Sequence, residues 1–164
     1  MKYNDWEKEV FAEIREDSLW KIKAYRLALF TSDIGWHDVS KLIKDGRTVK
    51  LSDQLYRALG SISANIAEGY SRGTGKDRAR FYEYALGPAR ESRDWYYKGR
   101  HVLGEAVATH RIKLLSEIIR LLLTMVPHQR GRILREDKSQ YDTNIPEAAT
   151  PTTLSNLLQD IPMP

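Results

Sequence analysis

The chain has 164 residues, no cysteine and a formal net charge of +4 at pH 7. This length predicts one domain with a substantial core, and the lack of cysteine excludes both a disulfide framework and a thiolate metal site. The charged first ten residues do not resemble a secretory signal, and no apolar run approaches the length of a membrane span. We therefore expect a cytoplasmic protein that does not enter a membrane.

The hydrophobic pattern predicts helices along the chain, without a convincing strand or hairpin. Residues 1–17 read as an acidic extension with a short helix. A first long helix is expected over about 18–44, with Asp17 or Ser18 as its cap and Asp45-Gly46 at its end. A second begins near residue 51, and we expect Gly69 to close it in the left-handed conformation.

After the glycine-containing loop at 70–75, Thr74 is the expected cap of a third helix over about 75–102. Gly104 separates it from a fourth helix over about 105–126. Four long helices with short connections predict an all-α fold, an antiparallel up-and-down four-helix bundle within residues 18–135.

Residues 136–164 contain four prolines among polar residues, which predicts a flexible tail. One apolar motif in the tail keeps helical spacing: Leu154, Leu157, Leu158 and Ile161. This motif could dock on a partner or on the bundle itself, and a chance cluster of apolar residues is an equal alternative.

The net charge is unevenly distributed along the chain. Residues 69–135 carry fourteen basic and six acidic residues (+8), whereas 1–17 carry three and six (−3) and 136–164 carry one and five (−4). A basic centre favours a polyanionic partner such as nucleic acid, although a charged stripe can equally be a solvated helix face.

The stretch from Leu51 to Tyr70 contains a long motif, Ser-Ile-Ser-Ala-Asn-Ile-Ala-Glu-Gly at 61–69, preceded by Gln54, Arg57 and Ala58. It resembles the four-helix-bundle family of proteins encoded in intervening sequences of bacterial 23S ribosomal RNA. Residues 81–87, Phe-Tyr-Glu-Tyr-Ala-Leu-Gly, resemble the third helix of that family. The resemblance covers about residues 18–126.

This resemblance implies assembly into ring-like homopentamers. One branch of the family, the accessory variability determinant of diversity-generating retroelements, partners a reverse transcriptase and binds nucleic acid through a basic surface. The resemblance therefore implies three partners for this chain: further copies of itself, RNA or DNA, and a reverse transcriptase.

Within the motif, Asn65 and Glu68 place an amide and a carboxylate on an otherwise apolar helix. One interpretation is a polar pair that acts inside or between subunits. The alternative, which we favour, is structural: Asn65 bonds to helix groups nearby and Glu68 pairs with an arginine, so that both determine helix register and assembly.

The predicted nucleic-acid-binding residues lie in the loop and the third helix that follow the motif. Arginine and lysine would contact phosphates, and exposed tyrosine would stack on bases. Trp95 is expected in the core, Tyr96 or Tyr97 outside it, and Arg130, Arg132 and Arg135 could extend the surface. The candidates are Arg72, Lys76, Arg78, Arg80, Arg90, Arg93, Tyr97 and Arg100.

No catalytic, metal or cofactor site is expected. The loop at 70–76 lacks the first glycine, the preceding strand and the final Ser or Thr of a phosphate loop, and no histidine lies in a Glu-x-x-His pattern. The sequence thus predicts a non-enzymatic, oligomeric nucleic-acid-binding adaptor. The alternative is a protein-interaction scaffold that recruits a partner through its N-terminal extension or C-terminal tail.

Overall fold

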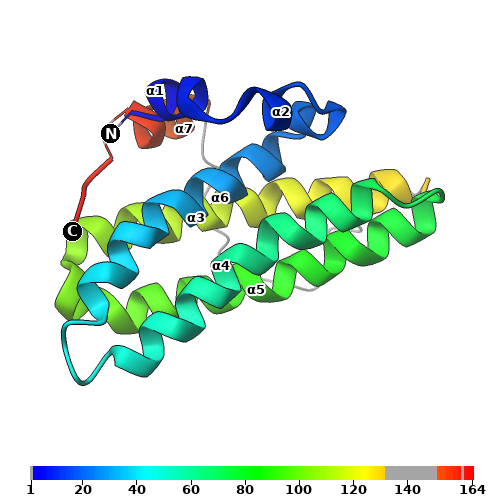
Figure 1. Cartoon of the computed structure of the whole chain (residues 1–164). Coiled ribbons are helices and arrows are strands. Elements are labelled where there is room, and N and C mark those ends of the chain that lie inside the picture. Colours follow the sequence, from blue (N-terminus) through cyan, green and yellow to red (C-terminus); the bar gives the residue numbers. More distant parts are fainter. Residues whose placement is uncertain (1, 132–150, 160) are drawn as a thin grey trace.

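The computed structural model describes residues 2–131, 151–159 and 161–164 (Figure 1). Every regular element in these residues is helical, which confirms the all-α prediction. None of the described helices is long and apolar enough to cross a membrane. The elements are α1 (Tyr3–Glu9), α2 (Ala12–Arg15), the 3-10 turn η1 (Ser18–Lys21), α3 (Lys23–Leu42), α4 (Val49–Tyr70), α5 (Gly75–Leu103), α6 (Glu105–Gln129) and α7 (Pro151–Gln159).

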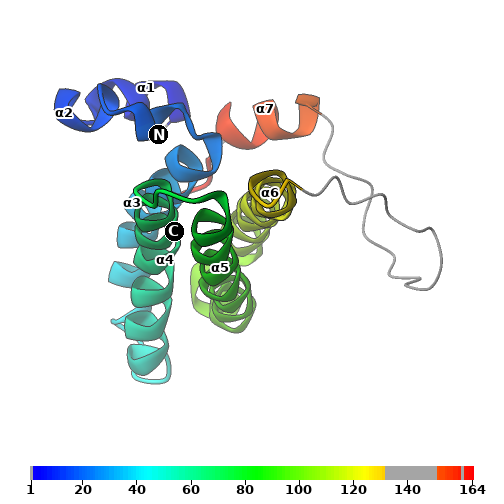
Figure 2. The same cartoon turned by 90° about the vertical axis from the view of Figure 1, so that its right-hand side faces the viewer.

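The four long helices form the body of the molecule. Helix α5 packs along α4 and α6, and α3 packs on α4 and α6 (Figures 1 and 2). Their inward faces enclose one apolar core, and many of its side chains are fully buried because they recur every three or four residues along each helix. Representative core residues are Phe30, Ile34, Leu55, Leu59, Ile62, Ile66, Leu114, Ile118 and Leu122.

The predicted helix cap at Thr74 is confirmed, whereas Asp17 does not cap the long helix for which it was predicted. The Asp17 side chain accepts a hydrogen bond from the Leu19 amide at 2.8 Å, but it caps the 3-10 turn η1, and α3 begins only after extended backbone at Ile22. The expected single helix over 18–44 is therefore divided. Gly104 separates α5 from α6 with a positive φ of 95°.

The expectation that Gly69 closes the second helix in the left-handed conformation is wrong. Gly69 lies inside α4, which continues to Tyr70, and among the described glycines only Gly104 and Gly131 have positive φ. What Gly69 provides is space. A Cβ atom there would lie 2.9 Å from the Phe81 Cβ and 2.9 Å from a Tyr82 ring carbon, so its absence lets α4 and α5 approach closely.

Both ends of the described chain pack on the same side of the long helices (Figures 1 and 2). In α1, the buried Trp6 donates from its indole nitrogen to the Asp33 carboxylate of α3 at 2.5 Å. Helix α7 contacts α6 and α1, and buries Leu154. The apolar C-terminal motif therefore docks on the long helices. Of the tail predicted to be flexible, 136–164, residues 136–150 and 160 lie outside the described residues.

Candidate nucleic-acid interface

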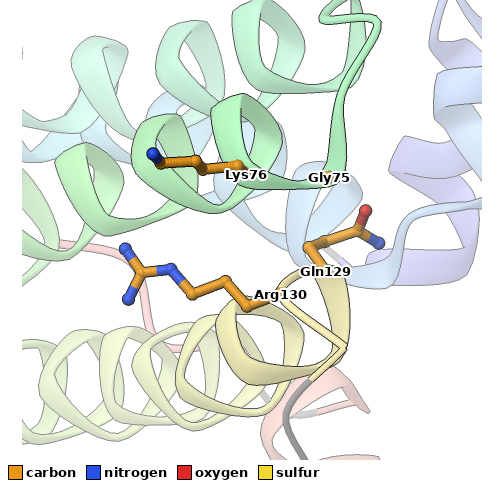
Figure 3. A pocket seen from close by; sticks show the side chains of 4 residues that line it. All are labelled: Gly75, Lys76, Gln129 and Arg130. Carbon is orange, nitrogen blue, oxygen red and sulfur yellow. The ribbon is translucent and has the colours of Figure 1, made fainter.

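The basic loop after α4 and the end of α6 meet at one end of the bundle. Gly75, the first residue of α5, lies directly against the Gln129 carbonyl oxygen of α6, because a Cβ atom on residue 75 would overlap that oxygen. Gly75, Lys76, Gln129 and Arg130 line a pocket, and Figure 3 shows the Lys76 and Arg130 side chains extending from it in the same direction. The close approach of α5 and α6 thus brings Lys76, from α5, and Arg130, from the end of α6, to the lining of one pocket.

One amide at the start of α5 is already capped by a side chain of the same segment. The Thr74 hydroxyl accepts a hydrogen bond from the Asp77 amide at 3.1 Å and donates to the Asp77 carboxylate at 2.7 Å. This arrangement supplies both the missing hydrogen-bond acceptor and the negative charge that a helix N-terminus favours. Any phosphate bound at this end would consequently be held by the cationic side chains.

Several of the candidate arginines are engaged within the fold. Arg72 pairs with Glu68 and lies 4.4 Å above the Phe81 ring. The half-buried Arg78 donates to the Arg72 carbonyl at 2.8 Å. Arg93, also half-buried, donates to the Ser116 hydroxyl of α6 at 3.2 Å. These side chains stabilise helix packing as well as contributing positive charge.

Two exposed tyrosines alternate with arginines along α5. Arg80 bonds to the Tyr84 hydroxyl at 2.6 Å and lies 5.5 Å from its ring centroid, and Arg100 lies 4.0 Å from the Tyr97 centroid. Tyr84 and Tyr97 are 47% and 56% exposed as residues, so each can still present part of its ring to a base. Sequence reasoning missed Tyr84, although its place four residues after Arg80 predicts a shared helix face.

Lys76 and Arg90 are exposed on α5 and form no ion pair with any described residue. The acidic groups of α5 that could neutralise them are used elsewhere. Glu83 pairs with Arg130 at 2.8 Å, and Asp94 pairs with Lys98 at 2.5 Å. Glu91 accepts a hydrogen bond from the Trp95 indole at 3.0 Å. Lys76 and Arg90 are thus the α5 cations most available to an outside anion.

The predicted outward face of the third helix divides into two parts. Arg90 and Tyr97 are exposed, whereas Arg93 and Arg100 lie at the boundary with α6, where Arg100 approaches Glu105 at 3.5 Å. Of the two tyrosines offered as exposed alternatives, Tyr97 is exposed and Tyr96 is fully buried. Trp95, expected in the core, is only half-buried. Arg132 and Arg135 lie outside the described residues.

Asn65 and Glu68 each contact a residue four positions away along the chain. The half-buried Asn65 amide donates to the Ser61 carbonyl at 2.7 Å, and the exposed Glu68 pairs with Arg72 four residues later. These two contacts bring no histidine and no second carboxylate to either side chain, so they do not form an acid–base pair. Their assignment to subunit assembly stays a prediction.

Sequence reasoning missed a buried polar network between three helices. Arg111 of α6 donates to both carboxylate oxygens of Asp38 in α3, at 2.8 and 3.1 Å, and the Tyr96 hydroxyl of α5 donates to the same carboxylate at 2.8 Å. All three side chains are fully buried. Burial, together with the nearby Asp38 charge, raises the pKa of Tyr96 well above its ordinary value, so the phenol stays a donor.

Among residues 2–131, 151–159 and 161–164, no group of three or more histidine or acidic side chains is arranged to hold a metal ion. A family model described as 23S rRNA-intervening sequence protein matches residues 21–124, which run from the end of η1 into α6. Comparisons with curated proteins and with solved structures found no match. The match covers more than half of the chain and confirms the resemblance of the Leu51–Tyr70 stretch. The chain belongs to the 23S rRNA-intervening sequence protein family.

Proposed function

We propose that this protein is a non-enzymatic nucleic-acid-binding adaptor that acts as an oligomer, with RNA or single-stranded nucleic acid as its ligand. Membership of a family named for ribosomal RNA intervening sequences supports an RNA-related role. The observation that carries the proposal is on α5, where Lys76 and Arg90 lack acidic partners among the described residues and the rings of Tyr84 and Tyr97 are exposed.

The proposed binding is electrostatic and largely independent of base sequence. Lys76, Arg80, Tyr84 and Arg130 line one pocket together with Asp77 and Glu83, so cations and a ring lie within one short stretch of surface. Cations that contact phosphates supply affinity by releasing counterions, and exposed aromatic rings stack on any base. Arg72, Arg78, Arg93 and Arg100 add positive charge around these contacts.

We further propose that α3–α6 form an antiparallel up-and-down four-helix bundle. Five such subunits would assemble into a homo-oligomeric ring. The family resemblance supports the ring, and Asn65 and Glu68 are our candidates for its subunit contacts. Native mass spectrometry tests this directly: five copies are expected, and a monomer would contradict it. A reverse transcriptase as protein partner is supported by the resemblance alone, and co-purification with one tests it.

Charge reversal tests the nucleic-acid site. We expect the Lys76→Glu, Arg90→Glu variant to bind a fluorescein-labelled single-stranded RNA about tenfold to a hundredfold more weakly at low salt, because two phosphate contacts are replaced by repulsion. The measurement is fluorescence anisotropy. Circular dichroism and native mass should stay unchanged, because both side chains are exposed.

The matched control is Lys2→Glu, Lys8→Glu, which changes the net charge equally but on the N-terminal helix α1 and its cap, away from the α5 surface. Both lysines are exposed, and the control should lower affinity by no more than about threefold through the overall field. Equal losses in the two variants would show that net charge alone, and not the α5 surface, governs binding.

The scaffold alternative has less support from the contacts. Three apolar residues that could recruit a partner are buried within the chain: Trp6 in the N-terminal extension, and Leu154 and Ile161 in the C-terminal segment. Phe11 of the extension, at 77% exposed, is a residue that a partner could still contact. Deleting residues 137–164 discriminates between the two functions. Loss of a protein partner with unchanged RNA binding would favour the scaffold.

A further inference from the structure

The C-terminal segment is held on the bundle by a small set of contacts. Leu154 and Ile161 are its buried side chains in the described residues. Two of its backbone carbonyls accept hydrogen bonds from neighbouring residues of α6: Leu157 from His110 at 2.7 Å, and Pro162 from Arg111 at 3.0 Å. The polar anchors of the segment thus come from the buried network.

The two bonds of the His110 ring determine its protonation state. The Arg111 guanidinium can only donate, so the His110 Nδ1 atom, 2.9 Å away, must accept and carry no proton. The Leu157 carbonyl can only accept, so the Nε2 atom must donate. Both requirements are met only by neutral imidazole with its proton on Nε2.

We propose that the described C-terminal residues, 151–159 and 161–164, form a detachable latch and that protonation of His110 releases it. A second proton would have to sit on Nδ1, where it faces the Arg111 guanidinium. It would remove the acceptor of the Arg111 hydrogen bond and place a second positive charge beside the first in a buried site. The bond from Nε2 to the Leu157 carbonyl would remain, so release follows from the cost of burying this charge beneath the latch. Arg111 itself stays paired with Asp38, so the bundle keeps its internal network when the latch leaves.

The groups around His110 favour the neutral form. Burial is the largest cause and lowers the pKa of His110 below its ordinary 6.5, and the positive charges of Arg111 and Lys113 lower it further. The bond to the Leu157 carbonyl and the charge of Asp38 oppose this shift without reversing it. The docked state therefore resists protonation.

The pKa of His110 is lower when the latch is docked than when it is detached, and this difference sets the direction of the pH effect. Once the latch detaches, His110 regains a pKa nearer 6.5 and binds a proton more readily. Docking is fully stable above that value and weakens as pH falls toward the lower pKa of the docked state. One proton allows the ratio of detached to docked molecules to rise by at most tenfold per pH unit.

Hydrogen exchange of the full chain between pH 7.5 and 5.5, corrected for intrinsic exchange rates, measures this ratio. We expect protection of the amides within 151–159 to fall by several-fold on acidification, while the core of α4, residues 55–66, stays protected. His110→Gln keeps an N–H donor for the Leu157 carbonyl but cannot titrate, and should remove the pH dependence. The matched control, His101→Gln at an exposed position on α5, should keep it.

Three results would overturn the proposal: unchanged protection of 151–159 in the wild type, a fall shared equally by α4, or full pH dependence in His110→Gln. The first two need no variant, so the test survives if His110→Gln fails to fold. Nuclear magnetic resonance of the wild-type imidazole nitrogens adds a direct check at pH 7.5. A proton on Nε2 is expected, and one on Nδ1 would contradict the assigned hydrogen bonds.

Discussion

Replacing Arg111 by methionine should strongly destabilise the fold. Methionine retains most of the apolar stem but removes every bond of the guanidinium, leaving the fully buried Asp38 carboxylate with only the Tyr96 hydroxyl as donor. Removing one partner of a buried ion pair costs about 3–5 kcal/mol, out of a total stability of about 5–15 kcal/mol for a typical domain. For a chain of this size that lowers the melting temperature by roughly 6–20 °C.

Urea unfolding followed by circular dichroism measures the loss of unfolding free energy. Arg57→Met is the matched control, because Arg57 pairs with Asp53 at 3.9 Å on the surface and should contribute less than about 1 kcal/mol. Adding Asp38→Asn to Arg111→Met removes the unpaired charge, so the double variant should cost clearly less than the sum of the single changes. A cost for Arg111→Met below about 1 kcal/mol would refute the reasoning.

Two further predictions concern the ends and exposed surface of the helices. Gly75→Ala should lower the free energy of unfolding by about 1–3 kcal/mol, because the added Cβ would overlap the Gln129 carbonyl. Gly60→Ala should raise it by about 0.5–1 kcal/mol, because nothing lies within 4 Å of the added Cβ. Urea unfolding measures both. If both substitutions changed the free energy of unfolding in the same direction, the assigned contacts would be contradicted. Thr74→Ala should cost about 1 kcal/mol by the same assay, since it removes the acceptor of the Asp77 amide, and an unchanged midpoint would show that the cap contributes nothing.

Local signals in the sequence predicted the helices well. The Thr74 cap and the Gly104 break depend on residues within one helical turn, so their chemistry is visible in the sequence. Trp95 and Tyr96 show the limit of this reasoning. They differ by only 100° around α5, and a periodic pattern cannot tell which of two adjacent rings faces inward until the neighbouring helices are in place.

The buried network could not be predicted because its members are far apart in sequence. Asp38 and Arg111 are 73 residues apart, and each interrupts an apolar pattern as a charged residue that would ordinarily face solvent. The basic residues of the candidate site were found from composition. Composition does not tell which of them form ion pairs. The positions of the acidic side chains on α5 and α6 decide this, and they leave Lys76 and Arg90 without an acidic partner among the described residues.

The salt dependence of RNA binding tests the central claim most directly. Each phosphate contact to a single strand contributes about −0.7 to the slope of log affinity against log salt concentration, so contacts from Lys76 and Arg90 alone predict a slope of about −1.4 or steeper. The Lys76→Glu, Arg90→Glu variant should have a slope shallower by about 1.4 units. A wild-type slope near zero, or no binding at low salt, would contradict the proposed function.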